Sequence, residues 1–279
     1  MKKSYVITAF LTSLLGVSFL GIEVVNHTTG IHVNAKSEKV AKVKKNKEEK
    51  YSKILRKAQK DGAKQGTVLA KTPKSSYVSE ASYVMGRKSF EDMDKKTAAT
   101  IQGVVTNWTS VPEAKNTAVT ILSVYVKEGL TPKSKKLAGK TIYIYQQGGY
   151  NKRKNFLDGM TDKQGMDQLS EQELNETIFY EKQGLPVPKI GTEIVASITK
   201  VGNLSTPKES QLVDLKRSYS LAWSEQGLWI KSPTSSKYET ASDFAAQENG
   251  NKVSTLGADN SVSAKIDEQI TDKINEITK

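Results

Sequence analysis

The feature that most constrains the fold is a β-forming segment, residues 118–126, that is apolar on both of its faces. Successive side chains of a strand point to opposite faces, so a strand between core and solvent alternates apolar with polar residues. Here the even positions and the odd positions are both largely apolar. Such a strand is covered on both faces or is strongly curved, which limits the fold to one that wraps or covers a sheet.

Other β-forming segments surround this strand. Residues 100–107 precede it, residues 139–149 follow it and close on a glycine pair, and residues 193–200 come later in the chain. Residues 219–223 and 227–231 are two further short β-forming runs. The two runs are joined around Ser224–Gly227, which predicts a terminal hairpin.

Two capping motifs place helices among these strands. Ser89 with Asp92 resembles a capping box and predicts a short helix directly before the first strand. Ser170 with Glu173 is a full capping box and predicts a helix over 171–181.

The order of these elements predicts the fold class. Strand, strand, strand, helix, strand, strand is the order of an oligonucleotide/oligosaccharide-binding (OB) barrel. We therefore expect a mainly β fold with peripheral helices, in which residues 76–231 form a small OB-like β-barrel and residues 150–188 form a helical insert.

The first 35 residues predict an export signal or a membrane anchor. Lys2 and Lys3 precede an uncharged, mostly apolar run over residues 4–22, which is the layout of a secretory signal. Val33 and Ala35 place small or apolar residues three and one before a possible cut after Ala35, which favours cleavage there. A retained anchor is the alternative, because the run is about the shortest that spans a bilayer. The lysines that follow the run leave a cytoplasmic body open as a third arrangement.

Residues 36–75 are predicted to be a basic helical stalk and linker. Residues 36–74 hold 14 lysines and arginines and four acids, which is +10 of the total formal charge of +12. Gly62 and Gly66 are expected to break the helix. Four lysines in its densest part are candidate contacts to an anionic cell-envelope polymer or a membrane surface: Lys42, Lys44, Lys45 and Lys47.

The C-terminal 48 residues change in character. Residues 232–260 are rich in Ser, Thr, Ala, Asn and Gly and predict a flexible linker. Residues 261–279 carry apolar side chains at spacings of three and four, which predicts an amphipathic helix. That helix either packs on the barrel or mediates self-association.

The residue inventory disfavours several kinds of catalysis. The chain has no cysteine, and both histidines, His27 and His32, precede Ala35. A chain cut after Ala35 lacks the residues of Ser-His-Asp and Cys-His triads and of His- or Cys-ligated metal sites. We therefore expect no catalytic residues, no metal ligands and no cofactor. A hydrolase that uses two carboxylates stays open as an alternative.

The strand over 139–149 carries the candidate ligand site. Tyr143 and Tyr145 share one face of it, and Ile142 and Ile144 share the other. Isoleucine has no polar atom, whereas the tyrosine hydroxyl favours a wet edge. The isoleucines are therefore expected to face the core, and the tyrosines to form a platform on which a planar ligand such as a sugar ring stacks.

Short motifs are spread over about residues 80–231. They are a short acidic helix, a Gly-Val-Val strand, a Thr-rich strand and these segments: Gly139–Ile142, Gly148–Gly149, Val187–Pro188, Gly191–Val195, Tyr219 and Gly227–Trp229. Together they resemble exported β-barrel proteins of Gram-positive bacteria that lack an assigned function. The resemblance implies a barrel fold and a location outside the cytoplasm, and it provides no catalytic residues.

Together these features favour an exported, non-catalytic cell-envelope binding or interaction protein, located outside the cell or anchored facing outside. Two alternatives remain: a carboxylate-based cell-envelope hydrolase, and a nucleic-acid-binding protein that uses the barrel and the basic arm. Few aromatic residues interleave the lysines and the barrel segment is nearly neutral, so the sequence disfavours nucleic acid as a partner.

Overall fold

The computed structural model describes residues 30–77, 87–111, 114–158, 168–201, 213–224, 226–231, 236–248 and 260–279. In the first and last helices, side chains are described from Val40 and from Ala264 onward. The signal or anchor predicted over residues 1–35 lies outside the described residues, except for the helical backbone from Gly30. Residues 45–279 form one compact unit, and residues 1–44 form another.

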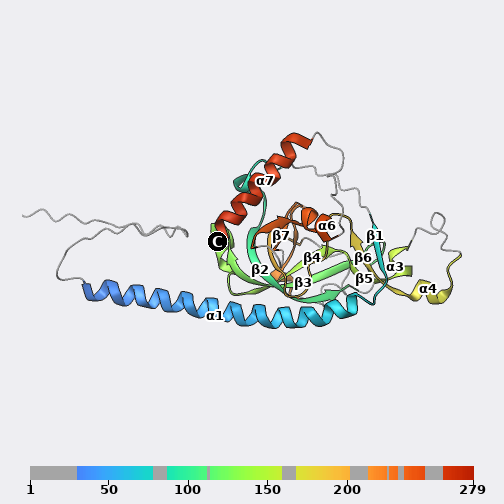
Figure 1. Ribbon diagram of the computed structural model, residues 1–279, viewed down its shortest axis with the longest axis horizontal. Coiled ribbons are helices and arrows are strands. Elements are labelled where there is room, and N and C mark those ends of the chain that lie inside the picture. The colour runs from blue at the N-terminus through green and yellow to red at the C-terminus, as the bar shows by residue number, and fades with distance from the viewer. Residues whose placement is uncertain are drawn as a thin grey trace, which may run out of the picture. The chain divides into compact units, whose positions relative to one another are not determined.

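The described chain is mainly β, with helices at the periphery (Figure 1). The helices are α1 Gly30–Leu69, α2 Phe90–Lys96, α3 Arg153–Phe156, α4 Glu171–Asn175, α6 Ala241–Glu248 and α7 Asn260–Ile277, with 3₁₀ helices η1 Pro132–Leu137 and η3 Leu215–Arg217. The strands are β1 Lys74–Tyr77, β2 Ala99–Ser110, β3 Val119–Gly129, β4 Thr141–Gln147, β5 Gly149–Lys152, β6 Thr177–Lys182, β7 Glu193–Lys200, β8 Ser218–Leu221, β9 Leu228–Lys231 and β10 Tyr238–Thr240. Within this part of the chain, none of the helices has the length and apolar character that a bilayer-spanning segment requires.

Five strands close into a barrel with the strand order of an OB fold, as the sequence predicts. β2, β3 and β4 form an antiparallel meander. β8 pairs in parallel with β4 and antiparallel with β7, and β7 returns antiparallel to β2. The closed ring leaves none of these five strands as an exposed edge.

Irregularities in β2 allow that strand to bend around the barrel. Its pairing with β3 shifts register between Gln102 and Gly103 and again between Val105 and Asn107. Such bulges bend a strand and increase its twist. A Cβ at position 103 would lie 2.5 Å from the carbonyl oxygen of Tyr125, so the first bend requires glycine.

The apolar residues on both faces of β3 are covered. Leu122, Val124 and Val126 are fully buried in the core cluster inside the barrel. On the outer face, Ile121 packs under the loop between β2 and β3, and Tyr125 packs against α1. The double apolar pattern of this strand therefore reflects a barrel interior and an outer covering.

The insert contains the short helices α3 and α4, and its strand β6 and the segment after it supply side chains that pack against the barrel core. Phe179 from β6, with Leu185 and Val187 after it, belongs to the main core cluster. The carbonyl oxygens of the two prolines accept hydrogen bonds from side chains: Gln146 Nε2 donates to Pro186 O and Trp108 Nε1 to Pro188 O, both at 2.8 Å. Side-chain donors thus satisfy these two carbonyls of the irregular segment.

The helix predicted over 171–181 is wrong beyond its first turn. The capping box at Ser170 forms, but α4 ends at Asn175. Residues from Thr177 form β6, which pairs in parallel with β1 and antiparallel with β5. The long-range strand pairing determines the conformation of this β-branched and aromatic run.

The predicted terminal hairpin is also wrong. β8 and β9 both run antiparallel to β7 and lie one after the other along it, β8 beside Ile198–Lys200 and β9 beside Ile194–Ala196. Between them the loop stays attached to Ser197, whose N–H donates to Gly227 O and whose carbonyl accepts from Ala222 N. β8 therefore closes the barrel, and β9 extends the sheet toward β10.

The segment predicted as a flexible linker, 232–260, contains β10 and α6. The helix predicted after it is α7, which packs on the outside of the sheet through Ile270 and Ile274. Polar contacts also hold it: Trp229 Nε1 donates to Thr271 Oγ1 at 3.0 Å, and Arg87 pairs with Asp267 at 2.7 Å. The apolar face offered for self-association is thus occupied within the chain.

The second half of the predicted stalk is docked on the barrel. Tyr51, Ile54, Leu55 and Ala58 pack against Val104, Tyr125 and Ile190. The helix continues through both glycines that were expected to break it. A Cβ at Gly62 would lie 1.9 Å from the carbonyl oxygen of Ile190, so this glycine allows α1 to approach the backbone of the barrel closely.

We expect Gly62→Ala to weaken the docking of α1 and lower the free energy of unfolding by about 1–3 kcal/mol, because the added carbon overlaps the Ile190 carbonyl. Gly66→Ala is the matched control. Nothing lies within 4 Å of its added carbon, and alanine is favoured over glycine in a helix by about 1 kcal/mol. The urea concentration at the midpoint of unfolding should therefore fall for Gly62→Ala and rise for Gly66→Ala. An equal rise in both variants would show that α1 is not docked at Gly62.

Candidate functional site

The two tyrosines predicted to form a platform lie on the outer face of β4. Ile142 and Ile144 are fully buried in the barrel core, so the predicted inward orientation of the isoleucines is confirmed. Tyr143 and Tyr145 point the other way and are half-buried. The alternation of β4 determines this orientation, because residues i and i+2 of a strand share a face.

A small apolar cluster surrounds the tyrosine rings. Val111 and Ala114 come from the loop between β2 and β3, Ile121 comes from β3, and Val213 precedes η3. In OB barrels, the loops at these two places flank the face that binds oligonucleotides and oligosaccharides. The tyrosines thus lie at the position of that face, with residues of both flanking connections packed beside them.

Arg217 adds a positive charge next to Tyr143. Its guanidinium carbon lies 5.5 Å from the centre of the Tyr143 ring, within cation–π range. Asp214 orients it, accepting a hydrogen bond from Arg217 Nε at 2.9 Å. This bond keeps the pKa of the Asp214 carboxyl below its usual range. Sequence analysis missed Arg217, since its position beside β4 depends on the pairing of β8 with β4.

A second polar cluster joins α1 to the barrel. The Tyr51 hydroxyl donates to Glu193 Oε2 at 2.9 Å, and Lys231 Nζ donates to Glu193 Oε1 at 3.1 Å. Lys231 also lies 5.9 Å from the ring centre of Tyr238, whose hydroxyl accepts from Gln102 Nε2 at 3.0 Å. Each oxygen of Glu193 is engaged by a donor of this chain, so this carboxylate anchors α1.

The four lysines proposed as electrostatic contacts are all exposed. Lys47 and Lys44 lie one and two turns before Tyr51 on the same face of α1. Lys42 lies on the opposite face, and Lys45 lies between the two. The four lysines are close together in sequence, but the helix does not bring all of them onto one surface.

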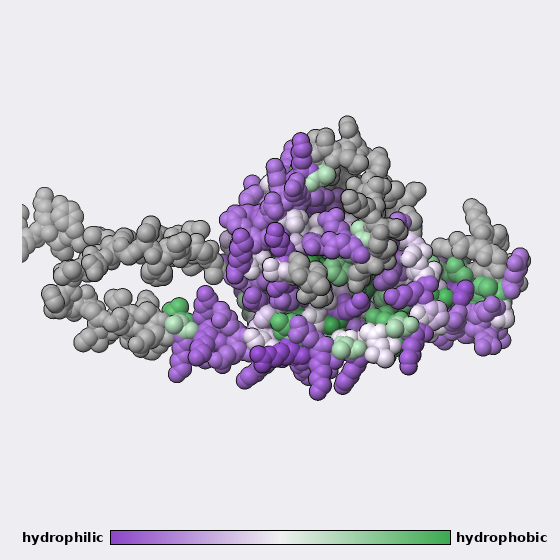
Figure 2. Space-filling view, in the orientation of Figure 1, coloured by the Kyte–Doolittle hydropathy of each residue, from purple (hydrophilic) through white to green (hydrophobic). Residues whose placement is uncertain are grey.

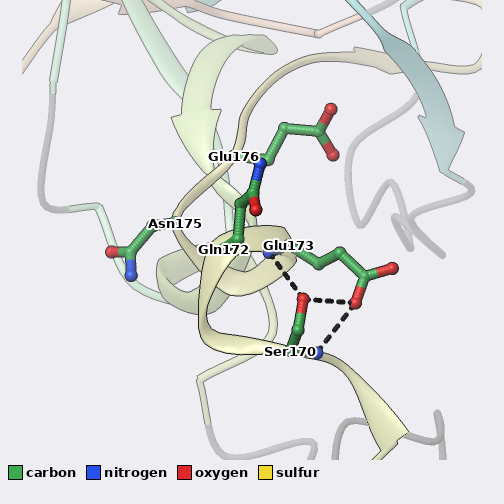
Figure 3. Close-up of a pocket in the computed structure, with 5 residues that line it drawn as sticks. All are labelled: Ser170, Gln172, Glu173, Asn175 and Glu176. Atoms are coloured by element: carbon green, nitrogen blue, oxygen red, sulfur yellow. Dashed lines mark hydrogen bonds between the residues drawn. The ribbon is translucent and has the colours of Figure 1, made fainter.

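A polar hollow lies beside α4 and is shown in Figure 3. Glu173 turns back on Ser170: its Oε2 accepts from Ser170 N at 2.8 Å and from Ser170 Oγ at 2.7 Å. Glu176 pairs with Arg153 at 2.7 Å. These contacts are those of a capped helix start and a surface ion pair, so the hollow does not gather unpaired polar groups toward a ligand.

Among the residues that the structure describes, no group of three or more His, Cys, Asp or Glu side chains could hold a metal ion. No protein-family profile, curated protein or solved structure matches this chain. Inferences about function therefore depend on the barrel and on its surface.

Ile144→Ala is expected to lower the free energy of unfolding by about 2–5 kcal/mol, as large-to-small changes in a core do. Tyr143→Ala and Tyr145→Ala should cost less, because their rings are half-buried on the outer face. Thermal unfolding of the three variants measures the difference. If the tyrosine variants unfolded at a lower temperature than Ile144→Ala, the outer cluster rather than the barrel interior would dominate stability.

Stability should also decline at high pH. Burial, and secondarily Glu193, raises the pKa of Tyr51 well above its usual range, and burial raises that of Tyr238. The unfolded chain therefore ionises these tyrosines first. Their contribution to the free energy of unfolding is complete below about pH 10. Above that pH it is lost at up to about 1.4 kcal/mol per pH unit for each tyrosine. In unfolding measured between pH 8 and pH 11, Tyr51→Phe should show a shallower decline than the wild type; an equal decline would contradict this assignment.

Proposed function

We propose that this protein is an exported, non-catalytic binding protein of the cell envelope, with a carbohydrate site on the outer face of β3 and β4. The observation that carries the proposal is the outward orientation of Tyr143 and Tyr145 on β4, with the Arg217 guanidinium 5.5 Å from the centre of the Tyr143 ring. OB-type barrels bind their ligands at the corresponding position. The basic and apolar N-terminal run supports export, as does the resemblance to exported Gram-positive barrel proteins.

The chemistry of the face favours a sugar. A tyrosine ring offers an apolar surface to the C–H groups of a sugar, and its hydroxyl offers a hydrogen-bonding edge. Arg217 supplies donors that suit hydroxyl or carboxylate oxygens. A few such polar groups around an apolar surface are typical of small-ligand sites.

The surroundings of the tyrosines favour a preformed site. Both tyrosines pack against the buried cluster of Val111, Ala114 and Ile121, and β4 is held between β3 and β8. Side chains that are already ordered lose less conformational freedom when a ligand binds. A rigid aromatic face is therefore expected to bind with a smaller loss of conformational entropy and without a rearrangement of the barrel.

Tyr143→Ala and Tyr145→Ala are each expected to weaken carbohydrate binding at least tenfold, because they remove the stacking surface. Tyr143→Phe keeps the ring and should keep most of the affinity. Tyr77→Ala changes a half-buried tyrosine outside this face and should leave binding unchanged. Calorimetric titration of the full chain with N-acetylglucosamine oligomers and with soluble envelope polysaccharides measures the affinities.

Two results would overturn the proposal. One is binding of these saccharides that is unaffected by Tyr143→Ala and Tyr145→Ala in chains that remain folded. The other is no binding of any saccharide in the panel by the folded wild-type chain. Cleavage of a saccharide during the titration would instead support the carboxylate-based hydrolase.

A further inference from the structure

The docked half of α1 separates apolar from basic side chains. Between Tyr51 and Leu69, the side chains that face the barrel are largely apolar and recur at spacings of three and four. The opposite face of the same turns is basic and exposed. Figure 2 shows hydrophilic side chains along this side of α1. The basic residues are Lys53, Arg56, Lys57, Lys60 and Lys64.

Most of these positive charges are not neutralised by the chain. Lys57 pairs with Asp61 at 2.9 Å, and this contact holds the pKa of the Asp61 carboxyl below its usual range. Within the described part of the chain, Lys53, Arg56, Lys60 and Lys64 form no salt bridge, although Asp61 lies close enough to attract Lys60 and Lys64. They follow one another every three or four residues, so neighbouring cations are separated by about 4.5–6 Å along the helix axis. The result is a row of four cations about 17 Å long, with Asp61 as a nearby acid.

The row is held rigidly by the packing of α1 on the barrel. Gly62 lies against the backbone of Ile190, and the backbone of Gln59 lies against Gly191. Gln65 Oε1 accepts a hydrogen bond from Ile190 N at 3.1 Å. These contacts lie on the turns that carry Arg56, Lys60 and Lys64, so the helix that spaces the cations is fixed before any partner arrives.

We propose that the outward face of α1, formed by Lys53, Arg56, Lys60 and Lys64, binds a linear polymer that carries phosphate groups. Regularly spaced cations on a straight helix match a chain of repeated negative charges, and release of the counterions of the polymer favours binding. This site is separate from the tyrosine face, so it holds or fails independently of the proposed carbohydrate ligand.

The packing of α1 favours a polymer over a lipid bilayer. A helix that lies in a membrane interface buries an apolar face among the lipids. In the docked half of α1 that face is already used against the barrel, through Tyr51, Leu55 and Ala58. Val68 is the exposed large apolar residue of this half. The remaining surface can offer charge but little apolar area.

The test compares two variants of the full chain with equal net charge. One replaces Lys53, Arg56, Lys60 and Lys64 by glutamine. The control replaces four exposed lysines on other elements by glutamine: Lys95, Lys136, Lys154 and Lys265. Binding to immobilised long-chain inorganic polyphosphate is measured from 50 to 500 mM NaCl. Vesicles of phosphatidylglycerol and phosphatidylcholine at 1:3 serve as the bilayer probe, and thermal unfolding checks that both variants remain folded.

We expect the α1 variant to bind polyphosphate at least tenfold more weakly than the wild type at about 100 mM salt. The slope of log K against log salt should fall by about 3, since each contact to a flexible polyanion contributes about 0.7. The control variant should lose much less of its affinity for polyphosphate. Equal losses in both variants would overturn the proposal, because net charge alone would then explain binding. Vesicle binding as strong as polyphosphate binding, with the same loss in the α1 variant, would also overturn it in favour of a bilayer.

Discussion

Closure of the barrel depends on β8, a strand of four residues that bridges β4 and β7. Without it, β4 and the end of β7 would be open edges, and open edges expose unpaired backbone groups. The pairs between β8 and β4 join residues more than 70 positions apart, such as Ile144 and Tyr219. The same pairing brings Arg217 beside Tyr143, so the candidate ligand face exists only when the barrel is closed.

Side-chain hydrogen bonds complete the backbone where regular pairing ends. Trp108 and Gln146 donate to the carbonyls of Pro188 and Pro186, in a segment where proline provides no N–H. Asn275 of α7 does the same for the edge strand β10: its side chain accepts from Tyr238 N and donates to Tyr238 O. Because buried polar backbone groups need partners, these side chains help to hold the insert and the last helix to the barrel.

The basic charge and the barrel are coupled through α1. An apolar stripe and the Tyr51–Glu193 hydrogen bond use one face of the helix for docking, while the lysines keep their hydration on the other. A solvated stalk would leave those charges free to move independently of the barrel. Docking converts part of the basic run into an ordered feature of the surface, next to a body that is nearly neutral overall.

The sequence by itself determined those features that depend on residues close together in the chain. Ser89 and Ser170 cap their helices as predicted, because a capping contact spans only three residues. The alternation of Ile142 and Ile144 with the two tyrosines determined which face of β4 enters the core. The order of strands, combined with the double apolar pattern of residues 118–126, was enough to predict an OB-like barrel. Features that depend on distant partners were decided only by the tertiary structure. β6 replaces most of the predicted helix because β1 and β5 pair with it, and β8 and β9 separate because β7 pairs with both. The backbone of Ile190 explains why a glycine stands at position 62 within a helix, because it leaves no room for a side chain. Tyr51 likewise forms a hydrogen bond with Glu193, 142 residues away in the chain. Local hydrogen bonds and periodicity are properties of a short segment, whereas these contacts arise only once the closed barrel brings distant segments together.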